Sequence, residues 1–303
     1  MCPPAAAGNH AGMTRTAPPP EYLTVRELAD LLRIKERKVY DLVAAGDVPC
    51  SRVTGKLLFP ERAIRDWIAS ASSGPGAASP RPLILLGSHD PLLEWALRQS
   101  RCGLATYLDG SLDGLARFRA REGIATGLHV HEGDGGWNRG TVAGAGIADA
   151  ALVGWARRRR GLVVRPEDAG RIGGIADLRD RRIARRQAES GAQSLFARLA
   201  EEAGLDPRTP AGPLARSESD AVQAVAQGHA DAAFGLEALA AQFGLHFVPV
   251  AEERFDLLVD RRAWFDPPMQ VLLEFCAGPD FRNQSAAMPG YDIAELGRVR
   301  WNG

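Results

Sequence analysis

The sequence predicts an α/β protein with two modules: a small helix-turn-helix module and a larger module in which strands alternate with helices. Three observations lead to this prediction. A Ser/Gly/Pro-rich stretch at residues 71–82 reads as a flexible linker. Before it, two short amphipathic helical patterns flank a tight turn. After it, short apolar runs such as LILLG and GLVVR alternate with helical patterns, which is typical of a parallel, doubly wound architecture.

Length and composition limit the class of protein. The 303 residues exceed one usual domain, so two or three domains are expected. Lys+Arg and Asp+Glu each number 37, so the chain carries no formal net charge. A nucleic-acid coat protein and an acidic tail protein are therefore excluded, and any basic surface must be local.

The N-terminus and the cysteines favour a cytoplasmic protein that does not contact a membrane. Residues 1–20 are rich in Pro, Ala and Gly and are expected to form a disordered tail. They lack the basic start and apolar core of a signal peptide, and no run of about 18 apolar residues follows. The four cysteines form no Cys-x-x-Cys pair, so neither a zinc site nor a disulfide framework is expected.

The small module spans residues 21–70. Thr24 and Glu27 have the spacing of a capping box and predict a first helix, and Gly46 predicts the end of a second one. Two β-prone runs around Thr54-Gly55 predict a hairpin, and Pro60 is expected to start a third helix. Ile64, Trp67 and Ile68 are expected on its inward side.

Positive charge is concentrated in this module. All three lysines of the chain lie here, and between Arg33 and Lys56 six basic residues stand against three acidic ones. The excess of basic residues lies on the expected second helix and the hairpin. In a protein that binds DNA, these elements would contact the phosphates and the base edges. The residues expected to contact double-stranded DNA are Lys35, Arg37, Lys38, Tyr40, Arg52 and Lys56.

The order helix, turn, helix, hairpin, helix over residues 21–70 resembles the winged-helix domains of the excisionase and MerR type. The resemblance implies a DNA reader, and such a small reader is expected to act as a homodimer on a two-fold related operator. The alternative is a module that binds a protein partner.

Four segments of the larger module share one design, in which an apolar strand is followed by a turn containing serine and then by a helix. Exposed N–H groups and the helix dipole make each helix start a place for an anion. The serines that would add hydroxyl donors are Ser88, Ser111, Ser190 and Ser219. The alternative is that each serine only caps its own helix.

Ser88, His89 and Asp90 are consecutive and have the residue types of a hydrolase triad. The side chains of three consecutive turn residues diverge, whereas a triad converges from separate segments. Asp90 followed by Pro91 instead predicts an N-cap and a first-turn proline. The known enzyme motifs, among them G-x-S-x-G and Walker A, are missing. We therefore expect no catalytic residues, although a hydrolase that pairs Ser88 with His131 stays open.

Residues 83–303 resemble the periplasmic-binding-protein-like (type II) domains of cytoplasmic regulators, which are related to molybdate- and tungstate-binding proteins. The matching pieces include GSHD, DGSLDGL, RRQAESGA and the late GYD. The resemblance implies two lobes, lobe 1 at about 83–158 and 256–303 and lobe 2 at about 159–255, with hinges at Gly161–Arg165 and Arg254–Val259. It places a small anion between the lobes, an oxyanion such as molybdate or tungstate. The ligand residues it implies are Ser88, His89, Gly110, Ser111, Arg186, Gln187, Ser190 and Gly191.

One loop departs from the pattern of these relatives, which read N-R-Q-x-G-S-G-T-R. The asparagine position is Arg185, the first glycine is Glu189, and the final Thr-Arg is Ala192-Gln193. A hydroxyl and a guanidinium are thereby lost and a carboxylate is gained, so the identity of the anion stays open.

Two further patterns have competing interpretations. His129 and His131 alternate along an expected strand and would share one face, but no third metal ligand is suggested, so structural histidines and no metal or cofactor are expected. The run Arg157–Arg160 enters an expected hinge strand and is interpreted as a solvated crossing, with contact to DNA or ligand as the alternative.

These observations together predict a ligand-responsive transcription regulator rather than an enzyme. The other hypothesis is a small-molecule binding or storage protein whose N-terminal module binds a protein partner.

Overall fold

The computed structural model describes residues 21–53, 55–71, 80–133, 135–205 and 211–303. The chain forms two compact units that divide between Pro80 and Arg81. The expected tail at 1–20, Thr54 and most of the expected linker at 71–82 lie outside the described residues.

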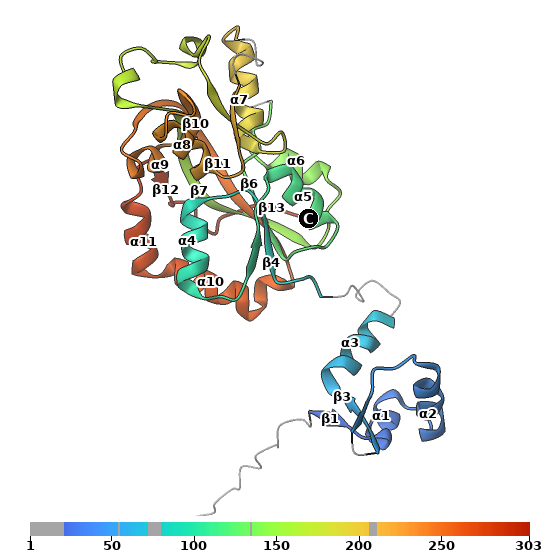
Figure 1. Ribbon diagram of the computed structural model, residues 1–303. Helices are drawn as coiled ribbons and strands as arrows, with labels where there is room; N and C mark the ends of the chain where they lie inside the picture. The colour runs from blue at the N-terminus through green and yellow to red at the C-terminus, as the bar shows by residue number, and fades with distance from the viewer. Residues whose placement is uncertain (1–20, 54, 72–79, 134, 206–210) are drawn as a thin grey trace, which may run out of the picture. The chain divides into compact units, whose positions relative to one another are not determined.

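The N-terminal unit contains a helix-turn-helix made of α1 (Val25–Leu32) and α2 (Glu36–Ala45) (Figure 1). The expected capping box is present, since Thr24 N donates to Glu27 Oε2 at 2.7 Å and Glu27 N donates to Thr24 Oγ1 at 3.3 Å. Helix α2 ends at Gly46, whose φ of 76° is the left-handed conformation that glycine adopts without strain.

A three-stranded sheet follows the two helices. Its order is β1 (Tyr22–Leu23), β3 (Lys56–Pro60), β2 (Ser51–Val53), and β2 and β3 pair antiparallel as a hairpin. Pro60 pairs with Tyr22 as the last residue of β3, and α3 (Glu61–Ala71) begins one residue later, so the prediction that Pro60 starts the helix is wrong. The core of this unit consists of Leu23, Leu28, Ala29, Val39, Val48, Phe59 and Ile64.

In the described residues, the C-terminal unit is built on a ten-stranded sheet. Its main path runs β5-β4-β6-β11-β7-β10-β8-β9, and two short strands also pair with β7. The strands are β4 (Ile84–Gly87), β5 (Ala105–Tyr107), β6 (Ala125–Leu128), β7 (Ala150–Val164), β8 (Ile183–Arg186), β9 (Ala211–Ala215), β10 (Ala232–Leu236), β11 (His246–Asp260), β12 (Tyr291–Asp292) and β13 (Val299–Asn302).

The sheet is parallel at its two ends and antiparallel in its middle. Strand β4 pairs parallel with β5 and β6, and β8 pairs parallel with β9 and β10. The long strands β7 and β11 pair antiparallel from His246↔Val164 to Asp260↔Ala150. They therefore extend from one group of parallel strands to the other. The expectation of a parallel sheet therefore holds for the outer strands and is wrong for the centre. We call the β4–β6 end lobe 1 and the β8–β10 end lobe 2.

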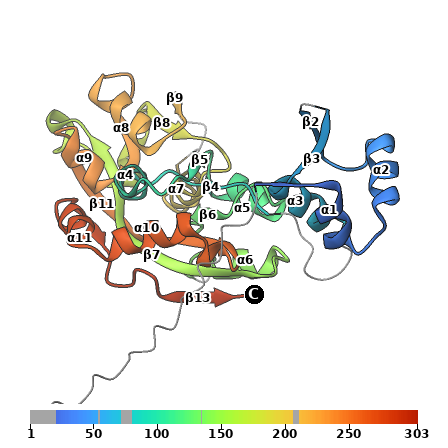
Figure 2. The ribbon, with the colours of Figure 1, turned by 90° about the horizontal axis from the view of Figure 1, so that it is seen from below.

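Helices cover both faces of each lobe. Those of lobe 1 are α4 (Pro91–Ser100), α5 (Ser111–Arg119) and α6 (Arg139–Gly144), joined by the C-terminal α10 (Pro267–Ala277) and α11 (Pro279–Ala286). Those of lobe 2 are α7 (Gly191–Glu202), α8 (Glu218–Ala226) and α9 (Glu237–Gln242). Figures 1 and 2 show α4 and α10 side by side, and the two helices are in contact.

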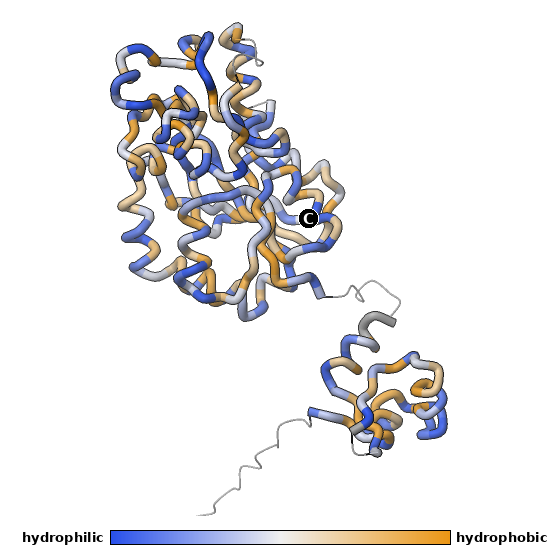
Figure 3. Tube along the Cα trace, viewed as in Figure 1, coloured by the Kyte–Doolittle hydropathy of each residue, from blue (hydrophilic) through white to orange (hydrophobic). Residues whose placement is uncertain are grey.

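Each lobe has two hydrophobic clusters, one on each face of the sheet. In lobe 1, Trp155 and Phe255 belong to the cluster under α4 and α10, and Phe118 belongs to the cluster under α5 and α6. Figure 3 shows the hydrophobic stretches along the central strands. No helix in the described parts of the chain is both long and apolar enough to cross a membrane.

Candidate functional site

The residues expected to bind DNA lie on the surface of the N-terminal unit. Lys35 is the N-cap residue of α2, and its side chain makes no capping hydrogen bond. Arg37, Lys38 and Tyr40 are exposed on α2, while Val39 between them is fully buried. Arg52 and Lys56 are exposed on β2 and β3 of the hairpin. Contact of these six side chains with DNA stays a prediction.

The first-lobe residues expected to bind the anion are buried together. Ser88 lies directly after β4 and Ser111 starts α5, and their Oγ atoms share a hydrogen bond of 2.7 Å. Ser111 Oγ also accepts from the backbone N–H of His129 at 3.1 Å. His89 lies beside this pair, with Nε2 2.9 Å from Glu94 Oε2 and with no hydrogen-bond partner for the buried Nδ1.

Two glycines allow the lobes to touch at this place. A Cβ atom added to Gly110 of lobe 1 would lie 2.8 Å from Glu189 O of lobe 2. A Cβ atom added to Gly191 would lie 2.4 Å from His129 O across the same contact. The Leu112 N–H donates to Glu189 O at 3.2 Å, so the lobes are joined by a backbone hydrogen bond.

The second-lobe residues expected to bind the anion divide into two kinds. Arg186 and Gln187 are engaged: the Arg186 guanidinium donates to Ala215 O and Arg216 O, and Gln187 Nε2 donates to Asp109 Oδ1 at 2.9 Å across the lobe contact. Ser190 is 1% exposed, and its Oγ has no hydrogen-bond partner in the described parts of the chain. A buried hydroxyl without a partner is costly and therefore indicates a ligand position.

Beside these residues lies a buried cluster of charges that the sequence did not predict. We call it the interlobe ion cluster; its members are Asp90, Arg158, Arg160, Arg186, Glu218 and Glu253. Arg158 Nη1 lies 2.7 Å from Asp90 Oδ2, and Arg160 Nη1 lies 3.0 Å from Glu218 Oε2. Glu253 accepts from both arginines, with 2.7 Å to Arg160 Nε. The cluster joins lobe 1 to lobe 2 through the crossing strands.

The interpretation of Arg157–Arg160 as a solvated crossing is therefore wrong for half of the run. Side chains alternate between the faces of a strand, so Arg158 and Arg160 of β7 share one face and are fully buried. Arg157 and Arg159 share the other face and are partly exposed, where they pair with Glu295 and Glu237.

Asp90 caps α4 as predicted and also accepts hydrogen bonds from three side chains. Its Oδ1 accepts from the Leu93 N–H at 2.7 Å, as expected of a cap, and also from Trp155 Nε1 at 3.1 Å. Its Oδ2 accepts from Arg158 and from the Tyr291 hydroxyl at 2.6 Å. One carboxylate therefore connects α4 with β7 and the C-terminal segment.

The two histidines have different surroundings. Strand β6 ends at Leu128, so the alternation expected for His129 and His131 does not apply. His129 Nδ1 lies 3.1 Å from Glu253 Oε2, and burial lowers the pKa of His129 against the opposing effect of Glu253. His131 packs edge-on against Trp137, and its Nε2 lies 3.3 Å from Arg198 Nη2. Within the described ranges, no group of three or more His, Cys, Asp or Glu side chains is placed to hold a metal ion.

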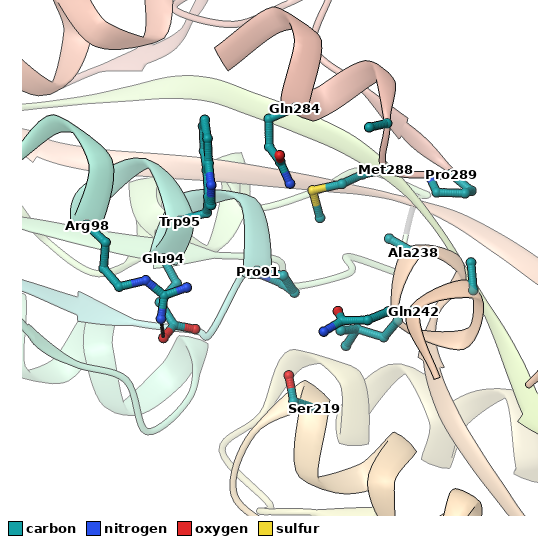
Figure 4. A pocket seen from close by; sticks show the side chains of 13 residues that line it. Pro91, Glu94, Trp95, Arg98, Ser219, Ala238, Gln242, Gln284, Met288 and Pro289 are labelled. Carbon is teal, nitrogen blue, oxygen red and sulfur yellow. Dashed lines mark hydrogen bonds and ion pairs between the residues drawn. The ribbon is translucent and has the colours of Figure 1, made fainter. Parts of the chain in front are cut away.

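A cavity of about 560 Å³ opens between the lobes next to the ion cluster. Pro91 and Ser219 line it, and they directly follow Asp90 and Glu218. Figure 4 shows Trp95 and Met288 on the lobe 1 side and Gln242 on the lobe 2 side. Ser219 is not the cap of α8, because the Ser217 hydroxyl accepts from the Asp220 N–H. The volume is in the range of small-ligand sites.

Gly191→Ala is expected to loosen the contact between the lobes. The new methyl group would collide with the backbone carbonyl of His129, which has no room to move because it lies in the buried lobe contact. We expect the Leu112 amide to exchange at least about tenfold faster in hydrogen-exchange mass spectrometry, a change of roughly 1.4 kcal/mol. Gly144→Ala is the matched control, since its Cβ would meet no heavy atom within 4 Å. Unchanged protection of Leu112 in Gly191→Ala would contradict the contact.

The ion cluster also predicts how stability depends on pH. Burial raises the pKa of Glu218, but Arg160 and Arg186 outweigh it and lower the pKa to about 2 from the ordinary 4.5. A lowered carboxyl pKa stabilises the folded state fully above about pH 4.5, and this stabilisation is lost as the pH falls toward 2, by up to about 1.4 kcal/mol per pH unit. Urea unfolding at pH 7, 4.5 and 3 measures this loss. Glu218→Gln should show a smaller decrease between pH 4.5 and 3; an equal decrease would assign the acid sensitivity to other carboxylates.

Two α/β lobes joined by a pair of crossing strands, together with a helix-turn-helix unit, define the class of this protein. A family model described as a helix-turn-helix domain matches residues 22–72. The model of the PBP superfamily domain matches residues 94–277, which is more than half of the chain, and the chain belongs to this family. Helix-turn-helix domains are of the DNA-binding type, and PBP-like domains are of the substrate-binding type.

The chain is similar to the uncharacterized protein YvgK of Bacillus subtilis (strain 168), with 26% identity over 305 residues that cover 91% of this chain and 96% of that protein. It is also similar to the tungstate ABC transporter from Geobacter sulfurreducens, with 12% identity, a TM-score of 0.47, and coverage of 67% of this chain and 96% of that one. An ABC-type phosphate transport receptor from Vibrio cholerae gives 10% identity and a TM-score of 0.45 over 69% of this chain and 98% of that one.

Proposed function

We propose that this protein is a ligand-responsive transcription regulator that binds operator DNA through its winged helix and a small anion between its lobes. The observation that carries the proposal is the lobe contact, where the buried Ser190 Oγ has no hydrogen-bond partner among the described residues and the Ser88 and Ser111 hydroxyls bond to each other. A ligand with acceptor oxygens would satisfy these donors.

The small size of the contact favours a compact anion. Gly110 and Gly191 let backbone atoms of the two lobes approach directly, so a bulky ligand would have to separate them. A tetrahedral oxyanion such as molybdate or tungstate has four acceptor oxygens and suits hydroxyl donors contributed by both lobes. The proposed ligand residues remain Ser88, His89, Gly110, Ser111, Arg186, Gln187, Ser190 and Gly191.

The interlobe ion cluster limits how this anion is held. Its three guanidinium groups already face three carboxylates, so they present no excess positive charge to a ligand. The anion would therefore be held mainly by neutral hydroxyl and backbone donors, as at a helix N-terminus, and Arg186, paired with Glu218, would add no net charge. Ser111 lies at the start of α5, and Ser190 is the N-cap residue of α7, at the two helix starts that meet here.

Regulation would follow from a change in lobe closure. A ligand that binds the closed state 100-fold more tightly than the open state supplies about 2.7 kcal/mol, which is enough to alter the relation of two DNA readers in a dimer. In this proposal the protein is a cytoplasmic homodimer that acts without catalysis.

A thermal-shift screen of the full chain tests the ligand part of the proposal. Molybdate, tungstate, sulfate and phosphate are compared with small carboxylates, and an oxyanion at 100 times its Kd is expected to stabilise the protein by about 2.7 kcal/mol. Ser190→Ala should lose this stabilisation, whereas Ser194→Ala, whose hydroxyl donates to Ser190 O within α7, should retain it. If only an organic compound stabilises the protein, the oxyanion assignment is wrong.

Selection of bound genomic DNA fragments tests the regulator part. We expect a defined operator whose affinity changes when the stabilising anion is added, as measured by fluorescence anisotropy. If the operator affinity does not change when the anion is added, the two units are not coupled. If the protein does not bind DNA, a storage protein with a protein partner is favoured.

A further inference from the structure

A second cavity, separate from the lobe contact, lies at the lobe 1 end of the crossing strands. Its volume is about 610 Å³, and we call it the hinge cavity. Four arginines line it together with an aromatic ring and a buried carboxylate: Arg139, Arg254, Arg298, Arg300, Trp137 and Asp256. They come from α6, β11, β13 and the adjoining loops, so the cavity forms only in the folded unit.

The charges of the hinge cavity are not balanced. Arg298 and Arg300 contact Glu295, each at 2.6 Å. Arg139 and Arg254 form no ion pair with any side chain in the part of the chain that the structure describes. Glu132, the other lining carboxylate, already accepts from Thr141 N at 2.7 Å and from Thr141 Oγ1 at 3.0 Å. Four guanidinium groups therefore face three carboxylates, Glu132, Asp256 and Glu295, and this excess of positive charge favours an anion, for which arginine is well suited when the anion is a phosphate.

Asp256 supplies a different kind of contact. It is 2% exposed, and its Oδ2 accepts from Asn138 Nδ2 at 2.7 Å, but its buried Oδ1 has no hydrogen-bond partner. Arg300 Nε lies 3.7 Å from that oxygen and is also without a hydrogen bond. A cavity-lining carboxylate whose oxygen makes this long ion pair and no hydrogen bond could accept from a ligand hydroxyl or amine donor.

Asn138 holds these groups in place at the cost of backbone strain. Its φ is 61° with ψ of −36°, a sparsely populated conformation for a residue other than glycine. Its amide donates to Asp256 Oδ2 and to Arg254 O at 3.3 Å, and its Oδ1 accepts from Val130 N at 2.6 Å. Strain of this kind is retained where the surrounding structure enforces it, and here it positions two residues that line the hinge cavity.

We propose that the hinge cavity binds a nucleotide. The arginines would hold its phosphate groups, Asp256 Oδ1 would accept from a ribose hydroxyl, and the Trp137 ring would contact the base. A cavity of this volume is larger than inorganic phosphate requires and is in the range of small organic ligands. Arg254 directly follows Glu253 of the interlobe ion cluster on β11, so a bound nucleotide would touch the strand that joins the lobes.

Calorimetric titration of the full chain with ADP tests this proposal. ADP is expected to bind, and the double variant Arg139→Gln with Arg254→Gln should weaken ADP binding about 100-fold, because each of the two charged hydrogen bonds lost costs about tenfold in affinity. Arg179→Gln removes an exposed arginine outside the hinge cavity and should leave the affinity unchanged. Asp256→Asn should also weaken ADP binding. A thermal unfolding curve of this variant shows whether it is folded.

Inorganic pyrophosphate is the second probe and should bind more weakly than ADP, since it lacks the ring and the hydroxyls. The proposal is overturned if millimolar ADP gives no heat of binding, if the double arginine variant binds ADP like the wild type, or if pyrophosphate binds as tightly as ADP. Loss of duplex DNA affinity in the double variant, without nucleotide binding to the wild type, would assign the arginines to DNA and would also overturn it.

Discussion

Glu253→Ala is expected to lower the free energy of unfolding of the C-terminal unit by about 3–5 kcal/mol. Glu253 is fully buried and accepts from Arg158, Arg160 and His129. Its pKa is held well below the ordinary value because the two arginines and His129 outweigh the effect of burial. Removing it leaves two buried guanidinium groups with one carboxylate fewer, and neither can lose its proton at neutral pH. Urea unfolding followed by tryptophan fluorescence measures the loss.

The adjacent Glu252 provides the control on the same strand. Its side chain is 62% exposed and lies 3.5 Å from Arg157, so Glu252→Ala should change the free energy of unfolding by less than about 0.5 kcal/mol. If the two variants are equally stable, the interlobe ion cluster does not support the fold and the role given to Glu253 is wrong.

The double variant Arg37→Ala with Lys38→Ala is expected to weaken binding of duplex DNA by about 10- to 100-fold at low salt. Both side chains are exposed on α2, the helix expected to read DNA. If each contacts one phosphate, the slope of log affinity against log salt should become shallower by about 1.8. Fluorescence anisotropy with a labelled duplex over a salt series measures both quantities.

Arg65→Ala is the matched control for the DNA experiment. Arg65 is on α3, its side chain is 65% exposed, and it pairs with Glu61 one turn away. It should leave the affinity and the salt slope nearly unchanged. If the double variant binds DNA as tightly as the wild type, α2 is not the helix that reads DNA. A module that binds a protein would then be favoured.

Local features of the fold were predictable because short-range chemistry decides them. The Thr24–Glu27 capping box and the glycine stop at Gly46 depend on residues within one helical turn, and both are present. The same holds for Asp90 and Pro91 at the start of α4. Pro60 was misplaced by one residue, because its fixed φ suits the end of a strand as well as the start of a helix.

The candidate site was predicted only in part. The serines at helix starts follow from the alternation of strands and helices, and the structure brings Ser88 and Ser111 together. The interlobe ion cluster was missed, because the carboxylates that neutralise Arg160 lie 58 and 93 residues away along the chain. One signal was available: alternate residues of a crossing strand face opposite sides, so two of the four consecutive arginines had to point inward.

The sequence by itself determined the two units, the helix starts at Thr24 and Asp90, the helix stop at Gly46, and the concentration of lysines on the N-terminal unit, since each depends on neighbours in the chain. Only the tertiary structure decided which arginines are buried, which serines meet and which glycines the lobe contact requires. The burial of the arginines depends on the antiparallel pairing of β7 with β11, which brings His246 opposite Val164 and Asp260 opposite Ala150. A charge becomes buried and paired through contacts between segments far apart in the chain, and residue order alone does not specify those contacts.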